Sequence, residues 1–186
     1  GNSFYETVDL VPTSANSYMQ FIVLGNSALE IVGSNNDISG NYFGGTQVMC
    51  GGTPMTKTSD KISNFFAVLL NVSTGENYVR NNTFKNITIN NPGNDVGVSM
   101  TYVVNGEAIV DNNTIENLIL NGSTTNVYYT PIWIITTGVT TISNNTIKNI
   151  ECTNATAANI GVINCIAKSN AGNCTISRNI IDNIYS

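Results

Sequence analysis

The sequence predicts an all-β protein, a parallel β-helix (solenoid) of about five coils with three short strands in each coil. A motif that pairs two asparagines with apolar residues recurs around Asn41, Asn82, Asn113, Asn145 and Asn179, at steps of 41, 31, 32 and 34 residues. Repetition at this interval indicates stacked copies of one supersecondary unit. The chain is also rich in Asn, Thr, Gly and β-branched residues and lacks a long helical periodicity, which disfavours α-helices.

The strands of each unit follow from aligning the copies on the first asparagine. Apolar residues lie three positions before it and two positions after it: Ile38, Val79, Val110, Ile142 and Ile176, then Phe43, Phe84, Ile115, Ile147 and Ile181. A glycine seven positions before it predicts a turn with positive φ, at Gly75, Gly106, Gly138 and Gly172. A third apolar segment, such as 96–104, precedes that turn. Each unit therefore supplies three strands that face a common core.

The asparagine column resembles the ladder of the right-handed parallel β-helix superfamily, the pectate-lyase-like group, over residues 17–186. The resemblance implies right-handed coils and an asparagine ladder formed by Asn82, Asn113, Asn145 and Asn179. In this ladder the amides hydrogen-bond between coils and asparagine tolerates the left-handed backbone conformation. We expect a second ladder at the next corner, Asn86, Asn117, Asn149 and Asn183, with Gly45 in its place in the first copy.

The resemblance indicates a fold more strongly than an activity. Lyases, hydrolases, phage spikes, adhesins and inert surface proteins all use such solenoids. Residues 17–186 are expected to form the β-helix domain, and residues 1–16 an N-terminal extension or edge segment. One further column holds Lys85, Glu116, Lys148 and Asp182, whose charges alternate between coils about 4.8 Å apart. We interpret this column as structural, because a slipped register would bring like charges together.

Composition narrows the class of protein. The 186 residues suffice for one domain, only 10% of them are charged, and the net charge is −5. An acidic chain lacks the basic surface that nucleic-acid binding needs. No stretch reaches the roughly 18 apolar residues of a membrane span. Because the sequence begins at Gly1, we expect a processed mature protein or an excised domain.

A catalytic constellation is not visible in the sequence, so we expect no enzymatic activity, metal or cofactor. The chain has no histidine, and its acidic residues are scattered. Glu76 and Glu107 fall near the same register in consecutive coils, where they form either a close carboxylate pair or two solvated turn acids. The second interpretation is favoured.

The sequence does not decide whether the cysteines form disulfides or whether the sequons are glycosylated. A disulfide among Cys152, Cys165 and Cys174 and buried free thiols are both compatible with the sequence, while Cys50 lies about three coils away. Eight Asn-X-Ser/Thr sequons are present, close to the number that composition gives by chance. Of these, we name Asn81, Asn112 and Asn144 as candidate N-glycosylation sites.

The apolar segment before each turn glycine predicts an exposed aromatic stripe. One face of this segment fills the core, and the other would expose Phe65, Tyr102, Tyr129 and Trp133, with Phe66 and Tyr128 as the alternatives at two positions. Such a stripe suits contact with another protein, cover by the N-terminal thirty residues, or stacking with a glycan.

The ends of a β-helix expose unpaired strands, which invite stacking of one copy on the next. The sequence stops at 183–186 within a repeat motif and shows no capping segment. We therefore expect an extracellular or cell-surface structural protein, a self-assembling filament or surface-layer subunit whose partner is itself. The alternatives are a glycan-binding or glycan-degrading module of an adhesin or phage-like spike, and a spacer or fragment within a longer β-helix.

Overall fold

The computed structural model describes residues 1–11, 17–25, 32–33, 35–58, 63–91, 96–122, 127–154 and 161–185. Its elements are β1 (Ser3–Phe4), β2 (Ser17–Leu24), β3 (Asp37–Ser39), β4 (Tyr42–Phe43), the 3-10 helix η1 (Val48–Cys50), β5 (Met55–Thr58), β6 (Ser63–Arg80), β7 (Thr83–Asn91), β8 (Val96–Asp111), β9 (Thr114–Gly122), β10 (Val127–Tyr129), β11 (Ile132–Ile134), β12 (Thr140–Ser143), β13 (Thr146–Asn154), β14 (Gly161–Ile163), β15 (Ile166–Lys168), β16 (Cys174–Ser177) and β17 (Ile180–Tyr185).

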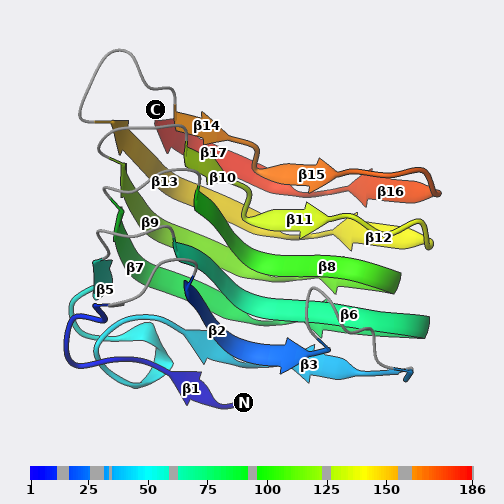
Figure 1. The fold of residues 1–186 in the computed structure, drawn as a ribbon, viewed down its shortest axis with the longest axis horizontal. Coiled ribbons are helices and arrows are strands. Elements are labelled where there is room, and N and C mark those ends of the chain that lie inside the picture. The colour runs from blue at the N-terminus through cyan, green and yellow to red at the C-terminus, as the bar shows by residue number, and fades with distance from the viewer. Residues whose placement is uncertain are drawn as a thin grey trace.

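These strands form a parallel β-solenoid, as the sequence predicts. One sheet has the order β1-β4-β7-β9-β13-β17, and the other runs through β2, β6 and β8 to the strand pairs β10/β11 and β14/β15. Figure 1 shows the chain crossing the nearer layer in one direction, returning through the farther layer, and rising with each coil. This is the right-handed sense, the rule for parallel crossovers.

The number of complete coils is about three, so the prediction of about five is wrong. Residues 63–91, 96–122 and 127–154 each pass round both layers and end in a strand of nine residues, β7, β9 or β13. Shorter strands extend the sheets below and above these coils. At the lower side β1 pairs with β4, so residues 3–4 belong to the sheet, while residues 12–16 lie outside the described part of the chain.

The predicted core columns lie inside the solenoid. Phe43, Phe84, Ile115 and Ile147 are all fully buried and stack from coil to coil. The ring of Phe4 lies 4.9 Å from that of Phe43, which lies 4.7 Å from that of Phe84, and both pairs are nearly parallel. Each buried side chain of this size stabilises the fold by about 1.5–3 kcal/mol. The repeated sequence therefore stacks like residues on like.

The first asparagine ladder runs through the buried corner of the coils, as predicted. Both the backbone N–H and Nδ2 of Asn82 donate to Oδ1 of Asn113, at 3.0 Å each. Nδ2 of Asn82 also donates to the carbonyl of Ile38 at 2.8 Å. The pattern repeats from Asn113 to Asn145 and from Asn145 to Asn179. The amides of Asn82, Asn113 and Asn145 thus each tie three coils together.

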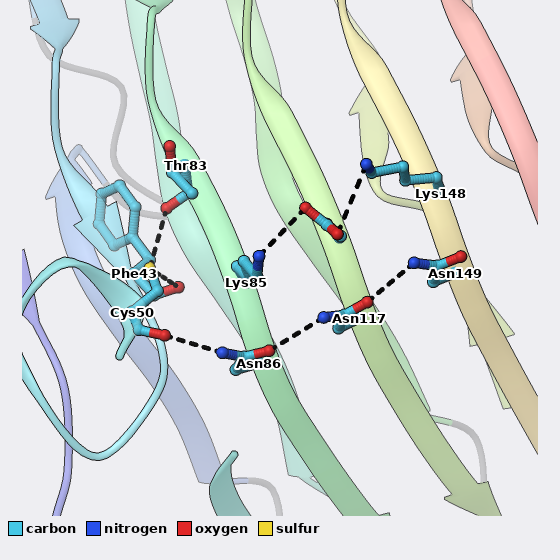
Figure 2. A network of polar contacts seen from close by, with 9 residues as sticks. Phe43, Cys50, Thr83, Lys85, Asn86, Asn117, Lys148 and Asn149 are labelled. Carbon is cyan, nitrogen blue, oxygen red and sulfur yellow. Dashed lines mark hydrogen bonds and ion pairs between the residues drawn. The ribbon is translucent and has the colours of Figure 1, made fainter. Parts of the chain in front are cut away.

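The second ladder is also present, and it runs with the opposite polarity (Figure 2). Nδ2 of Asn117 donates down to Oδ1 of Asn86 at 3.2 Å, and Nδ2 of Asn149 donates to Oδ1 of Asn117 at 2.9 Å. Nδ2 of Asn183 donates to Oδ1 of Asn149 at 3.1 Å and extends the column upward. At its lower end, Nδ2 of Asn86 donates to the carbonyl of Cys50 at 2.8 Å.

The left-handed backbone belongs to the second ladder and not to the first, which corrects the expectation for the first. Positive φ occurs at Asn86, Asn117, Asn149 and Asn183, and at the residues that precede the first ladder, Asn81, Asn112, Asn144 and Arg178. The preceding residue makes the turn, which leaves the ladder amide directed into the corner. In the first copy Gly40 and Gly45 have φ values of 67° and 70° at the same two positions. Glycine at position 45 therefore preserves the turn while it omits the amide.

Three of the four turn glycines behave as predicted. Gly75, Gly106 and Gly172 have positive φ. Gly138 does not, but a Cβ there would lie 2.3 Å from the carbonyl oxygen of Gly106 in the coil below. Close approach of the backbones, and not backbone conformation, requires glycine at position 138.

Candidate interaction surfaces

The predicted aromatic stripe is only half correct. Phe65 and Tyr129 are buried in the core, so their assignment to the surface is wrong. Phe66, one residue later, packs on the outer face beside Tyr102 but is only 6% exposed, whereas Tyr102 and Trp133 face outward as predicted, each half-buried. The side chain of Tyr128, the other alternative, lies outside the described part of the chain. The hydroxyl of Tyr129 has no hydrogen-bond partner among the described residues, and burial raises its pKa well above the usual value.

The outward aromatic side chains form a ladder of their own. The ring of Phe66 stacks on Tyr102 with centroids 4.6 Å apart and planes 21° from parallel, and Tyr102 lies 4.9 Å from Trp133. Tyr18 extends the series at 6.2 Å from Phe66. A sugar ring needs an exposed aromatic face to stack on, whereas here Phe66 and Tyr102 cover each other's faces and Trp133 packs on Tyr102 at a tilt of 49°. The geometry therefore favours a role in holding coils together over glycan binding.

The charge column on the outer face of β7, β9 and β13 is arranged as the sequence predicts. Nζ of Lys85 lies 3.4 Å from one carboxylate oxygen of Glu116, and Nζ of Lys148 lies 3.5 Å from the other (Figure 2). Asp182 is the register partner of Lys148 in β17. Pairs exposed in this way contribute about 0–1 kcal/mol each. Their alternation disfavours a slipped register, which would bring like charges together.

A second group of charged residues lies on β3 and on the later halves of β6 and β8. Glu76 and Glu107 are register partners, and the hydroxyl of Tyr78 donates to the carboxylate of Glu76. The Arg80 guanidinium donates two hydrogen bonds to Asp37, which lowers the pKa of that carboxyl. The carboxylates of Glu76 and Asp37 are thus held by neighbouring side chains on the same surface.

All four cysteines are free thiols, so of the two alternatives that the sequence leaves open, the structure has no disulfide among Cys152, Cys165 and Cys174. Cys50 and Cys152 are buried, Cys165 is partly buried and Cys174 is exposed on β16. The Cys50 thiol donates to the carbonyls of Phe43 and Thr83 (Figure 2), and burial raises its pKa to about 11.

The cysteines should differ sharply in reactivity toward a disulfide reagent such as dithionitrobenzoate at pH 8. Only the thiolate reacts, so exposed Cys174 should be modified first, while Cys50 and Cys152 should react only after denaturation. Mass spectrometry of the modified peptides identifies which residues react. Titration of only two thiols in denaturant, instead of four, would show that a disulfide forms after all.

The three candidate glycosylation sites occupy exposed corners of successive coils. Asn81, Asn112 and Asn144 are exposed and have positive φ. Nδ2 of Asn112 donates to Oδ1 of Asn81 at 2.7 Å, and Nδ2 of Asn144 donates to Asp111 at 2.8 Å. Their use as glycan acceptors stays a prediction.

The upper edge of the solenoid, formed by β16 and β17, presents core positions to solvent. Ile176 and Ile181 are 54% and 50% exposed, whereas their register partners Ile142 and Ile147 in the coil below are fully buried. The sequence aligns these residues with the core columns, and the structure adds that no described coil covers them. The edge is therefore an apolar surface bordered by unpaired strands.

The lower edge, formed by β1 and β2, holds two features that the sequence analysis missed. A pocket of about 460 Å³ is lined by Leu10, Met19 and Phe21 with Glu6. In the core above it, the side chain of Lys57 is fully buried, and its Nζ has no hydrogen-bond partner in the part of the chain that the structure describes. The sequence did contain a signal for this lysine. Side chains along a strand point alternately to the two faces, so Lys57, two residues after the core residue Met55, should point into the core as well.

Comparison with known proteins assigns no function to these surfaces. Among the described residues, no helix has the length and apolar character to span a membrane, and no three His, Cys, Asp or Glu side chains gather as metal ligands would. No family model, curated protein or solved structure matches the chain.

Proposed function

We propose that this protein is a structural subunit that works outside the cell or on its surface and self-assembles by stacking solenoids end to end. The observation that carries the proposal is the upper edge, where Ile176 and Ile181 are half exposed at positions that are fully buried one coil below. We also propose that the chain is a distant member of the pectate-lyase-like β-helix superfamily. The asparagine ladder and the parallel coils support that relationship.

The energetic case rests on apolar burial and on strand pairing. Complete burial of an isoleucine side chain contributes about 1.5–3 kcal/mol. Ile176 and Ile181 are already half buried, so covering them contributes a fraction of that value for each residue. The outer sides of β16 and β17 also carry backbone N–H and C=O groups that a further parallel strand would satisfy. A contact between the upper edge of one copy and the lower edge of another does not close on itself, so it generates a filament.

Electron microscopy and analytical ultracentrifugation of the purified chain test the proposal. The wild-type protein should form filaments with layers about 4.8 Å apart along the axis. Ile181→Lys, which places a charge on the apolar edge, should leave the protein monomeric. Thr175→Lys is the matched control, because it adds the same charge to β16 at an exposed position outside the core columns. Wild-type protein that stays monomeric across concentration would contradict self-assembly.

A further inference from the structure

The first asparagine ladder leaves complementary groups at the two edges of the solenoid. In every internal rung, the N–H and Nδ2 of one asparagine donate to Oδ1 of the next, as Asn145 does to Asn179 at 2.9 Å for both bonds. The ladder also extends below the predicted repeats, because the N–H and Nδ2 of Asn2 donate to Oδ1 of Asn41 at 3.0 and 3.4 Å. Asn2 is therefore the lowest rung and Asn179 the highest among the described residues.

The free groups of these two rungs match one another. Nδ2 of Asn179 donates one hydrogen bond, to the carbonyl of Ile142, so its second hydrogen and its backbone N–H have no acceptor in the described part of the chain. Oδ1 of Asn2 correspondingly accepts no hydrogen bond from the described residues. The upper edge thus presents two donors and the lower edge presents the oxygen that receives two donors in every other rung.

From this complementarity we propose that stacked copies join in one register and one polarity, with Asn179 of one copy donating to Asn2 of the next. The proposal rests on the end-to-end assembly proposed above and adds its geometry. The core supports the same register, because Phe4 follows Asn2 by two residues as Ile181 follows Asn179. Phe4 of the upper copy would then lie on Ile181 of the lower copy and continue the column of Phe43 and Phe84.

Inverted stacking is disfavoured by the same groups. Two upper edges in contact would bring the donors of Asn179 against identical donors, and two lower edges would oppose the acceptors of Asn2. Unpaired polar groups enclosed at such a contact each cost about 1–3 kcal/mol. Only the head-to-tail contact satisfies both asparagines, so every filament should have a single direction.

Two single-edge variants test the proposal. Asn2→Leu removes the acceptor at the lower edge, and the backbone N–H of residue 2 keeps its bond to Asn41. Asn179→Asp keeps the oxygen that Asn145 needs but replaces the upward amide with a carboxylate. Each variant alone should stay monomeric in analytical ultracentrifugation. An equimolar mixture should form a one-to-one dimer and nothing longer, because each variant retains the edge that the other lacks.

The outcomes separate this inference from the proposed function. Asn173→Asp, at an exposed position in the same coil, controls for the added charge, and circular dichroism confirms that each variant is folded. If both edge variants assemble as the wild-type protein does, the asparagine junction is wrong while end-to-end assembly stands. If the variants stay monomeric alone and also in the mixture, the contact does not join Asn179 to Asn2. A monomeric wild-type protein overturns both proposals.

Discussion

Replacing Asn113 by leucine is expected to lower the free energy of unfolding by about 4 kcal/mol. The substitution removes the acceptor of the Asn82 N–H and of its Nδ2, and the donor that reaches the carbonyl of Val79. Asn82 and Asn113 are both buried, so water cannot replace these bonds. Each buried group left without a partner costs about 1–3 kcal/mol, and the leucine recovers part of this through apolar burial.

Equilibrium unfolding in urea, followed by circular dichroism, measures this loss. Asn112→Gly is the matched control, because residue 112 is the exposed neighbour with positive φ, and glycine tolerates that conformation. The control should change stability by less than about 1 kcal/mol, the usual range for surface positions. If Asn113→Leu lowers the free energy of unfolding by less than about 1 kcal/mol, the ladder fixes the register of the coils but adds little to stability.

Replacing Lys57 by methionine is expected to stabilise the protein by about 3 kcal/mol at pH 7. Lys57 points into the core beneath Ile89, no described residue pairs with its Nζ, and burial lowers its pKa from 10.5 to about 8. A shift of this size corresponds to about 3 kcal/mol of free energy that the charged form loses on folding. Methionine has a similar length and removes the buried charge.

The pH dependence of this gain identifies its cause. A depressed lysine pKa means that the folded state binds fewer protons than the unfolded state between pH 8 and 10.5. The stability of the wild-type protein relative to Lys57→Met should therefore rise as pH increases through that window, and should be constant below pH 8. Lys85→Met removes a partly exposed lysine in the same way and controls for the effect of losing an amine that is not buried. A difference that is equal at pH 7 and pH 10.5 would contradict a buried charge.

The sequence predicted the solenoid and its ladders because one period governs every coil. Equivalent residues recur at nearly constant steps, so Asn82 and Asn113 had to meet once the chain closed each turn. The same logic placed Glu116 between Lys85 and Lys148. These features depend only on alignment between copies, which a repeated sequence records directly.

Features that depend on which way a side chain points were harder to predict. The strand containing Phe65 and Phe66 is apolar on both faces, so alternation could not decide which ring faces the core. The count of complete coils failed for a related reason, because the sequence motif marks one corner of a coil and not its whole circumference. The pocket at the lower edge and the exposed acceptor of Asn2 lie below the first clear repeat. No aligned copy of the motif covers that part of the chain, so the sequence could not predict them.

The opposed directions of the two asparagine ladders bear on how such a molecule can grow. Amide dipoles in the first ladder point one way along the solenoid axis, and those in the second ladder point the other way. In an α-helix, by contrast, aligned peptide dipoles sum to a net partial charge at each end. Here the side-chain dipoles of the two ladders offset each other coil by coil. Lengthening the solenoid, within one chain or between copies, therefore builds up a smaller field from these amides than two ladders of the same direction would.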